Sequence, residues 1–278
     1  MTALILTASI VGGLLLVGFL IYLFVLIRPS RTVKPAPALL CAYAHRGLHS
    51  TEIPENSISA FARACEKGYG IELDVQLSRD GEVMVFHDST LTRMTGCEHR
   101  LCELDAQELR ALRLLGSDEQ IPTLSEVLSL VRGRVPLLIE LKGETTDASL
   151  CPKVAALLRA YEGDYCIESF NPLALRWYRR KRKDVVRGQL SDAFHKEGEK
   201  KRFITFILQH LMLNCLGKPD FIAYNHKYPK GLSRKLCRGM FKNTAAAWTI
   251  KSEEELAAAK KHFDLFIFDS FVPRRKTI

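Results

Sequence analysis

The stretch that decides the fold runs from His45 to Asp88 and reads HRGLHSTEIPENSISAFARACEKGYGIELDVQLSRDGEVMVFHD. Its charged and imidazole residues come at the ends of apolar runs. His45-Arg46-Gly47 follows one such run, and Glu72-Leu73-Asp74 lies within another. Alternate residues of a strand point to the same side, so Glu72 and Asp74 are expected to face one spot. Two carboxylates placed in this way suit a hard divalent cation.

The Asp80-Gly81 pair predicts a β-hairpin, because Asp-Gly between two alternating apolar runs favours a two-residue turn. Such a turn pairs Asp74 with the segment 85–87. His87 is therefore expected beside the carboxylates, although it lies 13 positions further along the chain. An ordinary hairpin with solvated acids is the alternative. The whole group of residues favours a site instead.

The chain after residue 38 alternates apolar runs with segments of helical periodicity, which is typical of a parallel α/β fold. We expect a TIM (β/α)8 barrel, with the run 83–87 as a hairpin arm outside it. Active sites of such barrels lie at the carboxyl ends of the strands, where the motifs above also fall. The eight candidate barrel strands are 39–45, 69–75, 136–141, 164–169, 185–190, 220–225, 244–250 and 264–269.

Residues 88–134 separate the hairpin from the third barrel strand and are predicted to form a small inserted cap. A helix is expected near 105–115. A second helix is expected to begin after Thr123, which forms a capping box with Glu126 three residues later. The cap either shapes the substrate mouth or only covers the barrel end, and the sequence leaves both open.

Length and charge narrow the class of protein. The chain has 278 residues, enough for one barrel over 39–278 and an extra segment. Its net charge of +9 indicates an anionic partner, a membrane surface or a phosphorylated substrate. It carries no motif for binding nucleic acid, so nucleic acid is not an expected partner. Eight cysteines without a Cys-x-x-Cys pair favour reduced thiols in a cytosolic environment.

Residues 1–28 are predicted to be a single-pass transmembrane anchor, followed by a linker at 29–38. The uncharged run 3–27 reaches about 37 Å as a helix, more than the hydrocarbon core of a bilayer. Arg28, Arg31 and Lys34 follow at once, which places the catalytic domain in the cytoplasm by the positive-inside rule. A secretory signal peptide is the rival, but the run is long and has no basic segment before it.

The excursion 190–218 joins basic residues to the apolar run FITFILQHLMLNCLG, which is too short to cross a bilayer. A basic flank beside an apolar helix is typical of a membrane-surface element. Residues 202–217 therefore either lie at the membrane surface or form a core helix under a solvated basic face. Both interpretations stay open at this stage.

The ordered set of motifs resembles the glycerophosphodiester phosphodiesterase family. The first half carries His45-Arg46-Gly47, Pro54-Glu55-Asn56, Ala60-Phe61, Ile71–Val75 and His87-Asp88. The second half carries Ile121–Leu124, Ile139–Lys142 and Ser169–Asn171. The likeness covers about 40–271 and is weakest at the closing element, where the family's Asp-x-Pro is changed to Phe268-Asp269-Ser270-Phe271-Val272-Pro273.

The resemblance implies a set of roles. His45 and His87 are expected to act as general acid and base, in an order that the sequence does not fix. Glu140 shares a strand face with Lys142 and is expected to join Glu72 and Asp74 around one Mg²⁺ or Ca²⁺ ion. The expected substrate- and phosphate-binding residues are Arg46, Lys142, Glu55 and Trp248.

Three of these assignments keep an alternative. Glu55 is carried over from the family's Pro-Glu-Asn, either as an aid to the metal or as a residue that orients His45. Trp248 either lines the pocket, as a family aromatic does, or packs in the core. A salt bridge is the simpler account of Glu140 and Lys142.

Two functions follow from different classes of protein. The first is metal-dependent hydrolysis of glycerophosphodiesters or lysophospholipids to glycerol 3-phosphate, or lysophosphatidic acid, plus an alcohol. The second is a catalytically silent barrel that binds lipid headgroups at the membrane. A silent barrel has no reason to keep both histidines, Arg46, Lys142 and the three acids, so the sequence favours the enzyme.

Overall fold

A computed structural model describes residues 1–30, 35–143, 148–198 and 202–274. Eight parallel strands follow one another in the order β1-β9-β8-β7-β6-β5-β4-β2, and β1 pairs with β2 to close a barrel. The predicted TIM barrel is confirmed, and each of the eight expected runs overlaps one of its strands, with β2 and β6 ending beyond the expected bounds. These are β1 Ala42–Ala44, β2 Gly70–Leu77, β4 Leu137–Leu141, β5 Tyr165–Ser169, β6 Arg187–Ser191, β7 Phe221–Asn225, β8 Thr244–Ile250 and β9 Leu265–Phe268.

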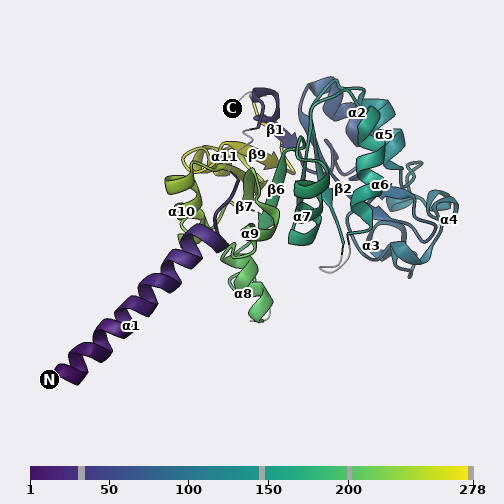
Figure 1. Ribbon diagram of the computed structural model, residues 1–278. Coiled ribbons are helices and arrows are strands. Elements are labelled where there is room, and N and C mark those ends of the chain that lie inside the picture. The colour runs from purple at the N-terminus through teal and green to yellow at the C-terminus, as the bar shows by residue number, and fades with distance from the viewer. Residues whose placement is uncertain (31–34, 144–147, 199–201, 275–278) are drawn as a thin grey trace.

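Helices surround the barrel (Figure 1). Their ends follow local capping rules: the Ser57 side chain accepts a hydrogen bond from the Ala60 amide, and Thr123 and Glu126 form the predicted capping box. The outer helices are α2 Ile58–Lys67, α5 Leu124–Val131, α6 Leu150–Leu157, α7 Pro172–Lys181, α10 Leu232–Phe241 and α11 Glu253–Ala259.

The hairpin is present, with a longer turn than predicted. Strand β3 (Val83–Val85) runs antiparallel to β2, with Val75 opposite Val85. The Ser78 amide donates to the Glu82 carbonyl, so three residues, 79–81, make the turn instead of two. Gly81 supplies the positive φ of +83° that such a turn needs. Asp74 still lies opposite Phe86, within the expected register.

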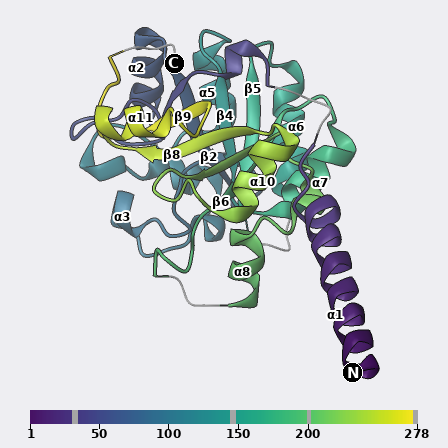
Figure 2. The same cartoon turned by 90° about the vertical axis from the view of Figure 1, so that its left-hand side faces the viewer.

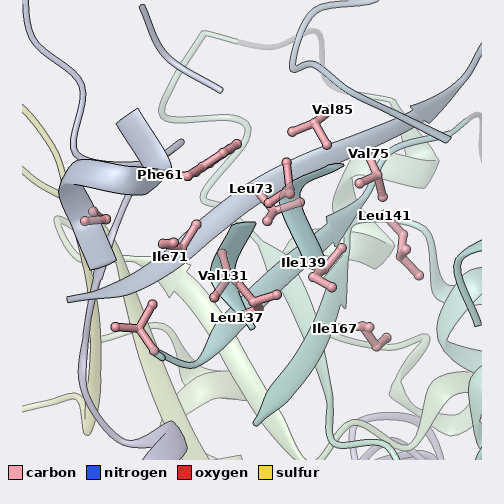
Figure 3. Packing of buried hydrophobic residues seen from close by; sticks show 14 of the residues in the cluster. Phe61, Ile71, Leu73, Val75, Val85, Val131, Leu137, Ile139, Leu141 and Ile167 are labelled. Carbon is pink, nitrogen blue, oxygen red and sulfur yellow. The ribbon is translucent and has the colours of Figure 1, made fainter. Parts of the chain in front are cut away.

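Side chains alternate along the strands between two faces of the barrel. The outer face, which packs against the helices, is apolar, and the inner face is polar at the carboxyl ends of the strands. Ile71, Leu73 and Val75 of β2 point outward and pack beneath α2 and α5, with Phe61 and Val131 (Figure 3). The residues between them, Glu72 and Asp74, must therefore point into the barrel. The same alternation in β4 places Ile139 outside and Glu140 inside. Burying one face against the helices fixes where the acids lie.

The inserted segment after His87 has a small hydrophobic core of its own. It contains α3 (Thr92–Thr95), α4 (Ala106–Ala111) and 3-10 turns at Leu101–Glu103 and Leu114–Gly116. Met84 and Phe86 of the hairpin contribute to this core, so the segment is fixed to the arm that carries His87.

The N-terminal segment is a helix that projects away from the barrel, α1 (Thr2–Ile21), and continues as a π-helix over Tyr22–Leu26 (Figure 1). The span Leu4–Leu26 is long and apolar enough to cross a membrane, with a mean hydropathy of 2.6. Its end is docked: Leu23 and Ile27 are buried in a cluster with residues of β7 and α10. Arg31 and Lys34, and with them part of the linker 29–38, lie outside the described residues.

The excursion after β6 contains α8 (Phe203–Gln209) and α9 (Asn214–Gly217). No residue of α8 is buried, and Phe203 is 80% exposed, so α8 is not a core helix. The run is not uniform, because Leu211 is buried against the end of α1. In both views α1 and α8 project on the same side of the barrel (Figures 1 and 2).

Candidate active site

Three predicted metal ligands meet inside the carboxyl end of the barrel. Glu72, Asp74 and Glu140 are buried, and each offers an oxygen within 4.8 Å of the others. Asp74 and Glu140 lie opposite each other in neighbouring strands, as the in-register pairing of β2 and β4 requires. Glu168 of β5 stands opposite Glu140 in turn. It is 1% exposed and adds a fourth carboxyl group to the layer.

Crowding of acids perturbs their protonation. Burial, followed by the charges of Asp74, Glu140 and Glu168, raises the pKa of Glu72 well above its usual range. Burial raises the pKa of Glu140 to about 7, and burial likewise raises the pKa of Glu168. Such a cluster is electrostatically incomplete without positive charge.

Two basic side chains supply part of that charge. Lys142 Nζ lies 2.8 Å from Glu140 Oε1 and 3.1 Å from Asp74 Oδ1, so the salt bridge offered as the simpler account is present. Arg46 Nε lies 3.6 Å from Asp74 Oδ2. Burial opposes the charge on Asp74, but Lys142, His87 and Arg46 outweigh it and hold the pKa of Asp74 below its usual range.

The backbone of the His-Arg-Gly motif is shaped by the site. Arg46 has a positive φ of 55°, and its amide donates to Glu72 Oε2 at 2.9 Å. Gly47 also has a positive φ, and a Cβ there would lie 2.9 Å from the Ala60 Cβ. Glycine is therefore required where this loop passes over α2. The loop turns His45 and Arg46 toward the acids.

Both predicted catalytic histidines are held by an aspartate through Nδ1. His45 Nδ1 lies 3.1 Å from Asp269 Oδ2, and His87 Nδ1 lies 2.6 Å from Asp88 Oδ1. This arrangement leaves Nε2 of each ring available to a substrate. Burial lowers the pKa of both imidazoles, and the bond to Asp269 partly offsets the effect on His45.

Glu55 lies beside the site without contacting His45 in the described part of the chain. Its Oε1 accepts from Arg46 Nη1 at 2.7 Å and from Arg93 Nη2 at 2.6 Å. Arg93 also donates from Nε to Asp88 Oδ2 at 2.6 Å. The chain of ion pairs therefore joins Arg46 to Asp88, the partner of His87. This geometry suits a residue that positions Arg46.

A cavity of about 110 Å³ brings most of these residues together. His45, Arg46 and His87 line it, with Glu72, Glu140, Lys142 and Glu168. Trp248 lines the cavity too, and its ring packs edge-on against that of Phe170 with 5.8 Å between the centroids, so both interpretations of this residue stay open. Its indole N–H is buried and has no hydrogen-bond partner among the described residues.

Two residues of the site were not predicted. Glu168 gives a weak signal in the sequence, the one acid of the apolar run Tyr165–Ser169, in step with Glu140 one strand earlier. Asp269 lies in the closing element, where the likeness to the family is weakest. It contacts His45, and its Oδ1 lies 3.0 Å from Nε2 of His49. Barrel closure brings Asp269 to His45 from 224 positions away.

The residues fit a hard divalent cation. The donor set is entirely carboxylate oxygen, which Mg²⁺ and Ca²⁺ prefer. Glu168 Oε2 is buried without a hydrogen-bond partner among the described residues. Burial raises the pKa of both Glu72 and Glu140, and the neighbouring acids add to this, so a bound cation would favour the ionised form of the cluster.

Several curated proteins are similar to this chain. A glycerophosphodiester phosphodiesterase of Caldanaerobacter subterraneus is 39% identical over 146 residues, which cover 48% of this chain and 59% of that protein. Glycerophosphodiester phosphodiesterase 1 of Mus musculus is 34% identical over 136 residues, 45% of this chain and 40% of the relative. The chain thus spans about half the length of these two relatives. The Homo sapiens protein of that name is 27% identical, covering 97% of this chain and 92% of the relative.

Solved structures share the fold and one family model covers most of the chain. A glycerophosphodiester phosphodiesterase from Thermotoga maritima has a TM-score of 0.64 and 25% identity, covering 82% of this chain and 93% of that one. A phosphodiesterase from Oleispira antarctica, solved with the product sn-glycerol-3-phosphate, has a TM-score of 0.66 and 23% identity over 82% and 92%. The family model matches residues 45–263. The chain belongs to the glycerophosphoryl diester phosphodiesterase family.

Proposed function

We propose that this protein hydrolyses glycerophosphodiesters, with release of glycerol 3-phosphate and an alcohol. One observation carries the proposal: two aspartate-held histidines and three clustered carboxylates belong to one small site at the carboxyl end of the barrel. Family membership supports the same reaction class. A silent headgroup-binding barrel is the alternative, and it gives no reason for the paired histidines.

The chain's own residues can perform the proton transfers. Either water attacks phosphorus while the bond to the departing alcohol breaks, or the neighbouring glycerol hydroxyl does so to form a cyclic phosphate, which a water molecule then opens to glycerol 3-phosphate. One imidazole, through its free Nε2, takes the proton of the nucleophile, and the other gives a proton to the departing oxygen. Arg46 and Lys142 hold the non-bridging oxygens, for which the guanidinium offers two parallel donors. The Trp248 N–H is free to donate to a substrate oxygen.

A single divalent cation bound by Glu72, Asp74 and Glu140 would polarise a phosphoryl oxygen and lower the pKa of a bound hydroxyl. The cluster also predicts competition between protons and the cation. Because carboxylates bind metal only when deprotonated and the pKa of Glu140 is raised to about 7, apparent metal affinity should fall as pH drops below 7.

Release of glycerol 3-phosphate from glycerophosphocholine, with and without EDTA, tests the function. We expect turnover that EDTA abolishes and that excess Mg²⁺ or Ca²⁺ restores, with more cation needed at pH 6 than at pH 8. Lysophosphatidylcholine in micelles serves as the second substrate, because lysophospholipids are diesters of the same type. Absence of turnover by folded protein on both substrates, with either cation, would favour the silent barrel.

Asp269→Asn tests whether Asp269 positions His45. The bond to Asp269 raises the pKa of His45, so its loss should move the limb of the pH–rate profile governed by His45 to lower pH. We expect kcat to fall about 10- to 100-fold with little change in KM, since a misoriented imidazole transfers protons poorly. The profile is measured with glycerophosphocholine at saturating cation. A uniform loss across pH, with no moved limb, would contradict this role.

We also propose that α1 anchors the protein in a membrane as a single span, with the barrel on the cytoplasmic side. The length and mean hydropathy of Leu4–Leu26 support this, and so do the exposed apolar residues of α8 on the side to which α1 projects. The segment 202–217 would then touch the bilayer surface through α8. Alkaline carbonate extraction tests the anchor. Intact protein should remain in the membrane pellet, whereas a cleaved signal peptide would leave a shortened, extractable chain.

A further inference from the structure

A cavity of about 820 Å³ lies apart from the candidate site, between the end of α1, α7 and α9. Seven of its eleven lining residues are lysine or arginine, and no acidic residue of the described chain lines it. Two of the lining residues, Arg187 and Lys218, stand at the amino-terminal ends of β6 and β7. The candidate site lies at the opposite ends of the strands, so the substrate phosphate does not account for this cavity.

Part of the basic wall is fixed by the backbone. Arg179 Nη1 donates to the carbonyls of Cys215 and Leu216 at 3.0 Å, and Arg187 Nε donates to the carbonyl of Gly217 at 3.0 Å. Lys218 Nζ donates to the carbonyl of Arg28 at 3.0 Å. Backbone carbonyls at the end of α9 and just after the N-terminal helix therefore hold these three basic side chains in place. This wall is a built feature of the fold.

The other four basic side chains of the cavity are not neutralised by an acidic side chain of the described residues. Arg28, Arg176, Arg180 and Lys183 line the cavity, and the described residues provide none of them with an ion-pair partner. Burial, followed by the charges of Arg28 and Arg179, lowers the pKa of Lys218. Asp220 pairs with Arg187 at 3.3 Å, but it is buried behind the wall. An anion would therefore complete the cavity.

The place of the cavity identifies the kind of anion. Arg28 lies two residues after the end of the apolar span Leu4–Leu26, at the position where a membrane-crossing helix meets the headgroup layer. Arg176 and Arg180 of α7 line the same cavity as Arg28 and therefore lie near that level. A phosphate group at that level is available from the surrounding bilayer.

We propose that this cavity is a second phosphate site, which binds the headgroup phosphate of an anionic phospholipid and so fixes the barrel against the membrane. The choice of a lipid as the source of the phosphate rests on the membrane anchor proposed above. Dissolved phosphate carries the same recognised group, so the experiment must separate the two sources.

The experiment uses the full chain in detergent and measures binding of phosphatidylglycerol by native mass spectrometry, without any turnover. The cavity variant carries Arg176→Gln, Arg180→Gln and Lys183→Gln. The matched control carries Lys235→Gln, Lys260→Gln and Lys261→Gln, which remove the same charge from exposed positions outside the cavity. Since each basic residue near a membrane surface contributes about a factor of five, we expect the cavity variant to bind at least tenfold more weakly and the control to bind as the parent does.

Further measurements separate the outcomes. Phosphatidylcholine should bind at least tenfold more weakly than phosphatidylglycerol. A different outcome is that millimolar inorganic phosphate raises the Tm of the parent and not that of the cavity variant, with no further rise in Tm from phosphatidylglycerol. That result would keep the phosphate site but overturn a lipid as its ligand. Equal loss of binding in both triple variants, or no loss in the cavity variant, would overturn the proposal. Circular dichroism shows whether each triple variant keeps the fold. If the cavity variant does not fold, the single variant Arg180→Gln repeats the binding measurement with a smaller change. Hydrolysis is not measured, so this result is separate from the fate of the proposed function.

Discussion

His87→Ala, and separately His45→Ala, should lower kcat for glycerophosphocholine by about 100- to 10,000-fold, the usual contribution of a positioned acid or base. Each ring lines the cavity and uses Nδ1 to bind an aspartate, which leaves Nε2 as the nitrogen that could contact the proposed substrate. KM should change little, because Arg46 and Lys142 remain to hold the phosphate. Steady-state kinetics at saturating cation measure both constants.

His99→Ala is the matched control for the histidine variants. His99 is exposed in the inserted segment and lies 3.5 Å from Glu103, outside the candidate site. Its replacement should leave kcat within a factor of two of the parent, since surface substitutions of this kind change stability little. A loss below tenfold for both His45→Ala and His87→Ala would remove the imidazoles from the chemistry and with them the proposed mechanism.

Glu72→Gln should separate stability from function. In the metal-free protein burial and neighbouring acids raise the pKa of Glu72 well above its usual range, so an uncharged isostere relieves repulsion. Glutamine can also accept the hydrogen bond from the Arg46 amide. We expect an equal or higher Tm without metal, no further rise on adding Mg²⁺ or Ca²⁺, and at least a 100-fold loss of turnover.

The parent protein should behave in the opposite way, with a lower Tm without metal and a clear rise when the cation is added. Glu66→Gln, at an exposed position of α2, provides the matched control and should respond to cation as the parent does. Thermal unfolding with and without cation measures all three proteins. A Glu72→Gln variant that still gains stability from the cation would show that Glu72 is not a ligand.

The parts that were predictable from the sequence are those set by short-range periodicity. Alternation alone places Glu72 with Asp74 and Glu140 with Lys142, and the parallel order of strands brings the two pairs to one rim. The eight barrel strands follow from apolar runs of the right length. The capping box at Thr123 needed only four residues of sequence.

The parts that were missed depend on contacts across the closed barrel. Asp269 reaches His45 because β9 pairs with β1, a contact that no local pattern encodes. The role of Glu55 depends on Arg93, which the inserted segment places beside it. The hairpin turn gained one residue, which moves the partner of Asp74 from His87 to Phe86, a shift within the predicted segment 85–87 that turn propensity alone does not resolve. The exposure of α8 depends on tertiary packing, which decides whether an apolar helix is covered.

The docking of Leu23 and Ile27 has a consequence for how the protein moves. A barrel joined to a membrane helix by a flexible linker can reorient freely above a bilayer. A barrel packed rigidly against that helix can reorient only together with the helix. The Asn214 side chain binds the Ile27 carbonyl at 2.9 Å, and Tyr22 Oη lies 2.7 Å from Ser233 Oγ. For the membrane anchor proposed above, lengthening the segment after residue 30 would therefore leave the tilt of the barrel relative to the N-terminal helix unchanged. Polar substitutions at Leu23 and Ile27 would let the barrel rotate relative to that helix.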